Sequence, residues 1–248
     1  MNSLFDVQGK VVLITGASRG IGKEMATAFA DAGAIVYGTA SRPESISQGH
    51  NPAIQMSACD VRDRGMLKDL MLRIKATHGR VDALINNAGI TSSSLASQVS
   101  DEEMQSLFET NLKGLFSACQ VYYSTQKREG CIINISSASA MRAMPGTSFY
   151  GSIKAGVIQT TQALAVEWAR RNIRVNCISP GFIKTDMNAH LRQNESTAAQ
   201  IAASIPLGFI GEPADVSGAA VFLVSNAARY ITGHNLVIDG GALSRASF

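Results

Sequence analysis

The sequence has few cysteines, and it has no long apolar run. Its four cysteines (Cys59, Cys119, Cys131 and Cys177) form no C-x-x-C pair, which argues against a zinc site or a disulfide framework and suits a reducing cytoplasm. No run of about 18 apolar residues is present, so no segment is expected to span a membrane. The N-terminal residues lack the basic, apolar and small-residue order of a signal peptide. We therefore expect a cytoplasmic protein.

Charged residues are also scarce, at 17% of the chain, against roughly 25% in an average soluble domain. Such a deficit is typical of a protein that buries extra surface in an oligomer, and an ordinary globular composition is the alternative. The net charge of +3 is too small for a nucleic-acid-binding protein, which usually carries a concentrated basic stripe. With 46% hydrophobic residues, the chain can bury a sizeable core.

Short apolar segments alternate with longer amphipathic ones along the chain. The runs VVLIT and CIINI are typical of strands buried on both faces of a parallel sheet. The alternation predicts one doubly wound, Rossmann-type α/β domain over residues 1–248, with a parallel sheet of about seven strands and helices on both faces. The expected strands are Lys10–Thr15, Ala34–Thr39, Ala53–Ser57, Ala83–Asn86, Cys131–Ser136, Arg174–Ile178 and Asn235–Ile238. The expected helices are Ile21–Ala32, Gly65–His78, Asp101–Gln126, Phe149–Arg171 and Pro213–Val224.

Residues 185–206 are the least regular part of this pattern, with polar segments that are compatible with short helices. In a doubly wound sheet, ligands bind beyond the carboxyl ends of the strands. A mobile segment at that edge is typical of a substrate lid. The alternative is a long surface connection.

The segment TGASRGIG (Thr15–Gly22) ends the first expected strand and opens the first helix. Glycines at such a turn (here Gly16, Gly20 and Gly22) let the backbone approach a pyrophosphate closely. The free N–H groups at the start of the helix attract phosphate. Because the segment lies in the first strand–helix–strand unit, it predicts a dinucleotide site, with Ser18, Arg19 and Ile21 as further contacts.

The end of the second strand lacks an acidic residue. NAD-binding proteins usually place an acid there to bind the ribose 2′-hydroxyl. This chain instead has Ser41 and Arg42, and Arg19 in the glycine loop is expected to lie close by. A hydroxyl and two guanidinium groups suit a 2′-phosphate. We therefore expect NADP(H) as the cofactor; the alternative is that both arginines are solvated surface charges.

Two further segments follow the third and fourth strands. Asp60 can accept a hydrogen bond from an adenine amino group while Val61 lies on the ring; the alternative for Asp60 is a helix N-cap. Asn87, Ala88 and Gly89 let the backbone pass close to the cofactor ribose. An ordinary turn would also use Asn and Gly.

Tyr150 and Lys154 are four residues apart in a helical segment, so they share a face. A free tyrosine has a pKa near 10 and is a poor acid at neutral pH. A nearby ammonium is expected to lower that pKa, which makes Tyr150 a candidate proton donor to a carbonyl oxygen. Lys154 is also a candidate to hold ribose hydroxyls. A helix-face pair without chemical meaning is the alternative.

Two more polar residues are candidates for the same chemistry. Ser137 follows the fifth strand, and its hydroxyl can stabilise charge on a substrate oxygen; Ser136 and Ser139 compete for this role. Asn111 lies within the expected helix Asp101–Gln126, where an Asn is unfavourable. It can hold a water that reaches Lys154, and the alternative is an Asn that faces solvent.

Together, these segments resemble the classical short-chain dehydrogenase/reductase family over essentially the whole chain. The resemblance rests on TGASRGIG, Asp60-Val61, NNAG, Asn111, Ser137, YGSIK and PGFIKTDM. It implies a catalytic tetrad, and the family's Ser-to-Tyr spacing selects Ser137 over its neighbours. The implied tetrad is Asn111, Ser137, Tyr150 and Lys154.

The resemblance also implies further cofactor contacts and an assembly. Pro180 and Gly181 are implied to pass the nicotinamide face, Ile183 to bind its carboxamide through the backbone, and Thr185 to contact a phosphate or an amide. The family typically forms homotetramers in which the two long helices pair between subunits.

Within the family, the chain looks most similar to the bacterial 3-oxoacyl-[acyl-carrier-protein] reductases. This implies NADPH-dependent reduction of a 3-oxoacyl thioester, with Arg128 and Arg171 as docking residues for an acidic carrier protein. A solvated helix terminus is the alternative for both arginines.

The chain departs from those reductases at two places. Thr91–Leu95 lack their usual Arg-Asp pair, and Gly146–Phe149 replace their usual approach to the tyrosine. Both departures lie at the implied substrate pocket, so reduction or oxidation of another ketone, secondary alcohol or sugar stays open. A non-catalytic NADP-sensing protein is a remote alternative, because such a protein is expected to lose the Tyr or the Lys.

Overall fold

The structure, a computed structural model, describes residues 4–46, 51–126 and 129–244. Within this part of the chain, seven strands form one sheet in the order β3-β2-β1-β4-β5-β6-β7, and every neighbouring pair is parallel. The strands are β1 (Val11–Thr15), β2 (Ile35–Ala40), β3 (Ile54–Ala58), β4 (Ala83–Asn86), β5 (Gly130–Ile135), β6 (Ile173–Pro180) and β7 (Asn235–Ile238). The predicted fold class is confirmed, and each strand lies where it was expected, with its ends shifted by a residue or two at most.

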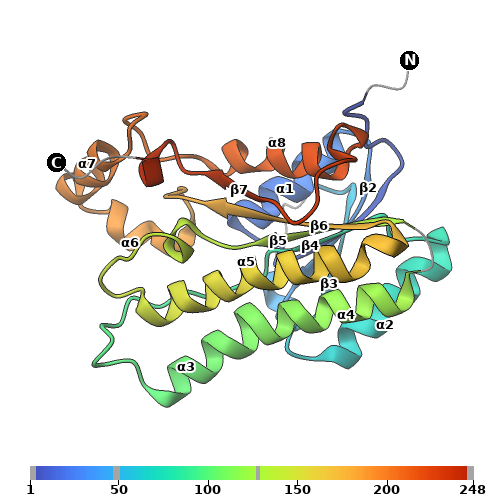
Figure 1. Cartoon of the computed structure of the whole chain (residues 1–248), viewed down its shortest axis with the longest axis horizontal. Helices are drawn as coiled ribbons and strands as arrows, with labels where there is room; N and C mark the ends of the chain where they lie inside the picture. The colour runs from blue at the N-terminus through green and yellow to red at the C-terminus, as the bar shows by residue number, and fades with distance from the viewer. Residues whose placement is uncertain (1–3, 47–50, 127–128, 245–248) are drawn as a thin grey trace.

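Helices cover both faces of the sheet (Figure 1). On one face lie α1 (Gly20–Asp31) and α8 (Pro213–Val224), and on the other lie α2 (Arg64–His78), α4 (Leu115–Thr125) and α5 (Ser148–Trp168). Alternate strand residues supply the two cores: Leu13 and Leu84 pack towards α2, α4 and α5, whereas Ile14 and Ile85 pack towards α1 and α8. The central strands β1, β4 and β5 are therefore mostly apolar, because both of their faces are buried.

The segment expected as one long helix over 101–126 is interrupted. It consists of α3 (Asp101–Phe108), a π-helical stretch η2 (Glu109–Gly114) and then α4. The prediction of a continuous α-helix is wrong at η2, where the wider turn places a polar side chain inside the protein. Such π-helical turns occur frequently at functional sites.

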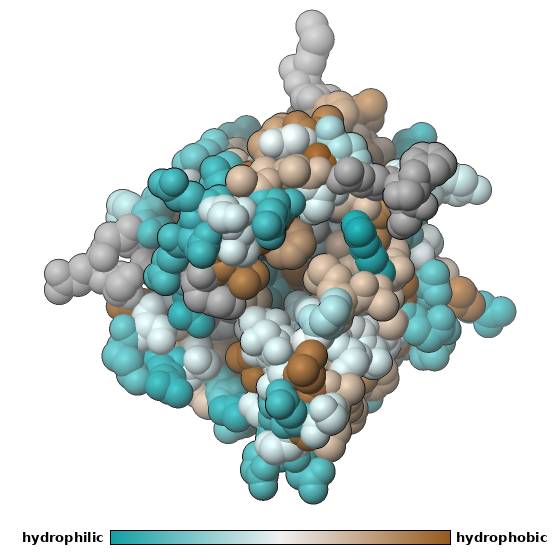
Figure 2. All heavy atoms as spheres, turned by 90° about the vertical axis from the view of Figure 1, so that its left-hand side faces the viewer, coloured by the Kyte–Doolittle hydropathy of each residue, from teal (hydrophilic) through white to brown (hydrophobic). Residues whose placement is uncertain are grey.

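The carboxyl ends of the strands meet at the left-hand edge of Figure 1, beside α6 (Ala189–Arg192) and α7 (Glu195–Ser204). Figure 2 looks onto this edge, where the surface is hollowed near its centre. Short 3-10 segments complete the chain: η1 (Pro43–Ser45), η3 (Ala138–Ala140), η4 (Ala169–Arg171), η5 (Asp186–Asn188), η6 (Asn226–Ala228) and η7 (Ala242–Ser244). In the described ranges, no helix has both the length and the apolarity needed to cross a bilayer.

Candidate active site

A cavity of about 400 Å³ lies at the carboxyl ends of β1 to β4. Its walls contain most of the residues predicted to bind the cofactor, which follow the ends of β1, β2, β3, β4 and β6. They are Gly16, Ser18, Arg19, Gly20, Ile21, Gly22, Ser41, Arg42, Asp60, Val61, Asn87, Ala88, Gly89 and Thr185. We call this cavity the nucleotide cleft.

The glycine loop of the cleft is packed so closely that two positions exclude any side chain. Gly16 has a φ of +66°, and a Cβ there would lie 2.7 Å from the Cα of Ala88. A Cβ on Gly22 would collide with the carbonyl oxygen of Gly16. Glycine is therefore required here both for the backbone conformation and for the close approach of the loop to the end of β4.

Thr15 and Asn87 tie this loop to β4. The Thr15 hydroxyl accepts hydrogen bonds from the backbone amides of Asn87 and Ala88, both at 3.1 Å. The Asn87 side-chain amide donates to the carbonyl oxygens of Thr15 at 3.1 Å and Gly16 at 2.9 Å. Sequence reasoning missed the role of Thr15; the available signal was a polar residue at the end of an apolar buried strand.

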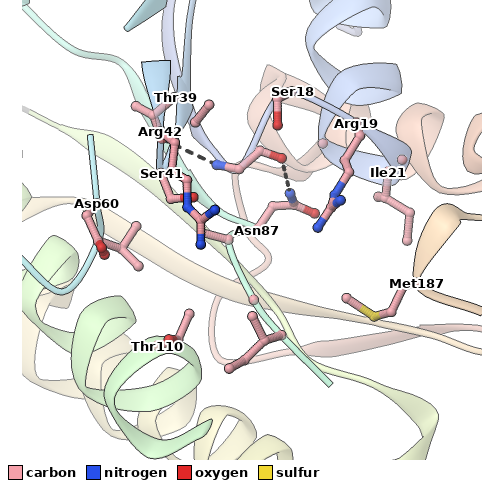
Figure 3. A pocket seen from close by; sticks show the side chains of 18 of the residues that line it. Ser18, Arg19, Ile21, Thr39, Ser41, Arg42, Asp60, Asn87, Thr110 and Met187 are labelled. Carbon is pink, nitrogen blue, oxygen red and sulfur yellow. Dashed lines mark hydrogen bonds between the residues drawn. The ribbon is translucent and has the colours of Figure 1, made fainter. Parts of the chain in front are cut away.

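Arg19 and Arg42 reach into the cleft from the glycine loop and from the segment after β2 (Figure 3). Both residues are exposed. Among the residues that the structure describes, neither guanidinium has an ion-pair partner. The two cations are therefore available to an anionic ligand, and the cleft carries positive charge at the end where a 2′-phosphate was expected.

Asp60 lies at the rim of the cleft, with Arg62 as its partner. The Arg62 side chain donates to both carboxylate oxygens, with its Nη2 at 2.6 Å from Oδ2, and this bonding lowers the pKa of Asp60. The N-cap alternative for Asp60 is wrong, because Asp63 caps α2 by accepting from the amide of Met66 at 3.0 Å.

A second cavity, of about 130 Å³, adjoins the nucleotide cleft. Ile21, Asn87, Gly89 and Thr185 line both cavities. The second cavity brings together the four predicted catalytic residues and the segment after β6: Asn111, Ser137, Tyr150, Lys154, Pro180, Gly181 and Ile183. The four catalytic residues come from η2, the segment after β5 and the first turns of α5, and the remaining three come from the end of β6 and the segment after it. Only the fold therefore assembles them.

Tyr150 and Ser137 both line this cavity. Desolvation raises the pKa of Tyr150, and the interaction with Ser137 offsets part of the rise. The expectation of a lowered Tyr150 pKa is therefore wrong for the net shift: the Lys154 Nζ lies 5.8 Å from the centre of the ring, too far to outweigh the loss of solvent around the phenol.

Of the three neighbouring serines, Ser137 is the one that faces Tyr150. The Ser136 hydroxyl is buried and donates to the backbone carbonyl of Lys154 at 2.7 Å. Ser139 donates its backbone amide to the Ser137 hydroxyl at 3.1 Å, which fixes the orientation of Ser137. The geometry thus agrees with the assignment that the resemblance implied.

Lys154 is almost fully buried, at 5% exposure. Its ammonium donates to the backbone carbonyl of Ile135, with 2.9 Å between Nζ and oxygen. Burial lowers its pKa to about 8, and Cys177 opposes the shift weakly. Lys154 therefore exchanges its proton close to neutral pH, which is the range where proton transfer is most effective.

Asn111 is also buried, at 1% exposure, so the solvent-facing alternative is wrong. Its side chain bonds to both backbone groups of Ile90: Oδ1 accepts from the amide at 3.0 Å, and Nδ2 donates to the carbonyl at 3.0 Å. The π-helical stretch η2 turns this side chain inward. Asn111 thereby fixes the segment that runs from the end of β4 along both cavities.

The family model described as "Enoyl-(Acyl carrier protein) reductase" matches residues 16–242. The 3-oxoacyl-[acyl-carrier-protein] reductase FabG of Chlamydia pneumoniae is 39% identical over 241 residues, which cover 94% of this chain and 96% of that protein. The chain belongs to the short-chain dehydrogenase/reductase family. As a member of this family, it is an oxidoreductase that acts on CH–OH and C=O groups.

Solved structures of this family have the same fold. A putative short-chain alcohol dehydrogenase from Sinorhizobium meliloti superposes with a TM-score of 0.92 at 36% identity, covering 98% of this chain and 100% of the other. A gluconate 5-dehydrogenase from Burkholderia cenocepacia, in complex with NADP and tartrate, superposes with a TM-score of 0.91 at 29% identity, covering 98% of each chain.

Of the two predicted docking arginines, the structure describes Arg171, which lines neither cavity. Arg171 ends η4; it donates to the backbone carbonyls of Tyr123, at 3.2 Å, and Gln126, and its guanidinium lies 4.1 Å from the centre of the Tyr123 ring. Arg171 thus caps the end of α4. Arg128 lies outside the described residues.

Proposed function

We propose that this short-chain dehydrogenase/reductase uses NADPH to reduce a 3-oxoacyl thioester to the 3-hydroxyacyl product. The observation that carries the reductase chemistry is the convergence of Tyr150, Ser137 and Lys154 on one cavity that adjoins the nucleotide cleft. The thioester substrate is supported by relatives of 38–39% identity that bear this activity in their names.

NADP(H) fits the nucleotide cleft on three counts. The side-chain-free loop at Gly16 and Gly22 leaves room for a pyrophosphate at the start of α1. Arg19 and Arg42 offer guanidinium groups without ion-pair partners in the described chain. In addition, NADP is present in the similar gluconate 5-dehydrogenase structure. When bound, the nicotinamide would supply or accept the hydride.

Each member of the tetrad has a separate task in this proposal. Tyr150 delivers the proton to the carbonyl oxygen. Ser137 donates a hydrogen bond to the same oxygen and stabilises its developing charge. Lys154, with its low pKa, relays protons to Tyr150 and binds ribose hydroxyls, and Asn111 holds the water through which the relay reaches solvent.

The first test is the oxidation of NADPH, beside NADH, with acetoacetyl-coenzyme A as the 3-oxoacyl thioester, followed at the absorbance of the reduced nicotinamide. We expect turnover with NADPH and much slower turnover with NADH. Turnover of a free ketone or a sugar, but not of the thioester, would overturn the substrate assignment and leave the reductase assignment in place.

The cofactor preference has its own test in Arg42→Ala and Arg19→Ala. Because each guanidinium can make a charge-assisted bond to the 2′-phosphate, each change is expected to raise the KM for NADPH about tenfold and to leave that for NADH unchanged. Arg64→Ala is the matched control, since Arg64 is an exposed arginine that bonds to Gln120 outside the cleft. Equal effects on both cofactors would contradict a 2′-phosphate site.

A second candidate function is the oxidation or reduction of a sugar or another secondary alcohol. It is favoured by the similar solved structures, which include a gluconate 5-dehydrogenase. The hydroxyl-rich segment Ser92–Ser94, which stands where the 3-oxoacyl reductases were expected to carry an Arg-Asp pair, also favours it. A panel of ketones, secondary alcohols and sugar acids distinguishes the two candidates.

The remaining predictions concern the whole chain. We propose that residues 1–248 form one domain, that 185–206 act as a substrate lid, and that four cytoplasmic subunits assemble. Thr185 and Met187 of the lid segment line both cavities, and α7 has no buried residue.

Arg171 lies roughly 30 Å along α5 from Tyr150, so a carrier protein docked on Arg171 and Arg128 would serve the cavity of a neighbouring subunit.

A further inference from the structure

The segment that leaves the end of β4 is held by a carboxylate on α3. Glu103, in the first turn of α3, accepts hydrogen bonds from the hydroxyls of Ser92 and Ser94, the latter at 2.9 Å from its Oε2. Ser92 and Ser94 are half-buried, whereas Ser93 between them is exposed. We call this short stretch the Ser92–Ser94 strap. Both of its half-buried hydroxyls therefore donate to the same carboxylate.

The opposite side of the strap rests on the turn that leads into α5. Gly146 has a φ of +81°, and a Cβ there would lie 2.7 Å from the carbonyl oxygen of Ser93. The same turn is closed by Thr147, whose hydroxyl donates to the carbonyl of Met144 at 2.9 Å. The strap thus lies between the start of α3 and the turn that positions Tyr150.

The strap continues directly from a segment that lines the catalytic cavity. Ile90 lines both cavities, and the side chain of Asn111 holds its backbone on both sides. Glu103 provides the next anchor along the chain. Asn111 holds the chain at Ile90, before Thr91, and Glu103 holds it at the Ser92–Ser94 strap, after Thr91.

We propose that Glu103 is a positioning residue for the carbonyl substrate, because it holds the Ser92–Ser94 strap at the edge of the catalytic cavity. The inference rests on the proposed reductase function of that cavity. Glu103 also belongs to the N-terminal turn of α3, where its backbone amide donates to the capping Ser100 hydroxyl at 3.2 Å. The experiment must therefore separate positioning of the substrate from stabilisation of α3.

The test compares Glu103→Ala with Glu102→Ala. Glu102 is an exposed acid in the same turn of α3, and it makes no hydrogen bond to the strap, so both variants lose one charge at the helix N-terminus. Loss of two hydrogen bonds to a carboxylate is expected to raise the KM for the carbonyl substrate about tenfold in Glu103→Ala. The kcat and the KM for NADPH are expected to stay near the wild-type values, as are all three constants in Glu102→Ala.

Two further variants identify the interaction itself. The double variant Ser92→Ala/Ser94→Ala is expected to raise the same KM to the same extent, and addition of Glu103→Ala to it is expected to have no further effect. Glu103→Gln, which retains one side-chain oxygen as an acceptor, is expected to recover part of the loss. An unchanged substrate KM in Glu103→Ala, an equal change in Glu102→Ala, or additive effects would each overturn the proposal.

Hydrogen exchange of the unliganded proteins gives a readout that needs no substrate. Amides in peptides that cover the strap and the Gly146 turn are expected to exchange faster in Glu103→Ala than in Glu102→Ala, with the strands unchanged. Equal exchange rates in the two variants would contradict the proposal that Glu103 holds the Ser92–Ser94 strap. Hydrogen exchange can support the Glu103 contact even if the wild-type protein turns over no oxoacyl thioester. In that case the proposed substrate is wrong, and the KM values of the variants are compared with the ketone or alcohol that is turned over.

Discussion

Tyr150 depends on its surroundings to act as an acid. Its side chain is half-buried and lines the catalytic cavity beside Ser137; desolvation raises its pKa, and the interaction with Ser137 lowers it in part. Tyr150→Phe is expected to lower turnover about 10³-fold, because general acid catalysis is lost, and to leave the Kd for NADPH unchanged. Stopped-flow turnover and fluorescence titration measure the two quantities. The control is Tyr230→Phe, at a fully exposed position; turnover retained in Tyr150→Phe would refute the mechanism.

Lys154 links catalysis to stability through its lowered pKa. The folded-state pKa is about 8 and the reference value is 10.5. Between these values the unfolded chain binds more protons at this residue than the folded chain, so the contribution of Lys154 to the free energy of unfolding rises with pH. Below about pH 8 the buried ammonium destabilises the fold.

The direction of this pH dependence can be measured by comparing the free energy of unfolding of the wild type with that of Lys154→Met. The free energy of unfolding of wild type relative to the variant is expected to increase by on the order of 3 kcal/mol as the pH rises from 8 to 10.5. Urea unfolding followed by the fluorescence of Trp168 provides the values. A difference that stays constant or decreases with pH would show that the Lys154 ammonium is not penalised by burial.

At the scale of elements, the turn from β1 into α1 is the most constrained part of the site. Gly16→Ala would place a methyl group against the backbone of Ala88 in a backbone conformation that side chains disfavour. We expect the variant to lose about 1–3 kcal/mol of stability and to bind NADPH much more weakly.

The matched control is Gly218→Ala in α8. A Cβ at Gly218 meets no atom within 4 Å, and the residue is exposed on the helix. Because alanine favours helix, this variant is expected to gain about 0.5–1 kcal/mol. Thermal unfolding and NADPH titration compare the two variants; similar behaviour of both would contradict the packing described for the glycine loop.

The π-helical stretch η2 is the element that sequence patterns did not predict. The pattern of Asp101–Gln126 is compatible with one uninterrupted helix, because periodicity does not distinguish a wide turn from a regular one. Asn111 is the residue that gave a signal, as a polar side chain in an unfavourable position. Its burial depends on Ile90, which is remote in sequence and bonds to both ends of its amide.

At the scale of the whole molecule, the helices α3, α4 and α5 leave apolar side chains at the surface. Val166 is 80% exposed on α5, and Phe108 and Phe116 are 42% and 38% exposed on α3 and α4. Together with the low charge content, these residues favour the proposed tetramer, in which the faces of these helices would be covered.

Val166→Glu is accordingly expected to weaken the assembly, because a carboxylate would be buried without a partner. Sedimentation velocity is expected to give four times the chain mass of 26.2 kDa for wild type and a smaller species for the variant. Tyr230→Glu, at an exposed position outside these helices, is the control. A monomeric wild-type protein would refute the tetramer.

The sequence by itself determined the sheet, its strands, the glycine loop and the Tyr150–Lys154 pair. Each of these follows from residues that are neighbours in the chain, through hydrophobic periodicity, helical spacing or the conformational freedom of glycine. The family resemblance added the choice of Ser137, which the contacts of Ser136 and Ser139 now explain.

Only the tertiary structure decided the partner of each buried polar group. Asn111 bonds to the backbone of Ile90, Tyr150 has a raised pKa, and Glu103 anchors a strap from an earlier loop. Burial and charge at these positions depend on segments that the fold brings together from distant parts of the chain. Hydrogen-bond partners and desolvation are therefore properties of the assembled edge of the sheet, which no local pattern contains.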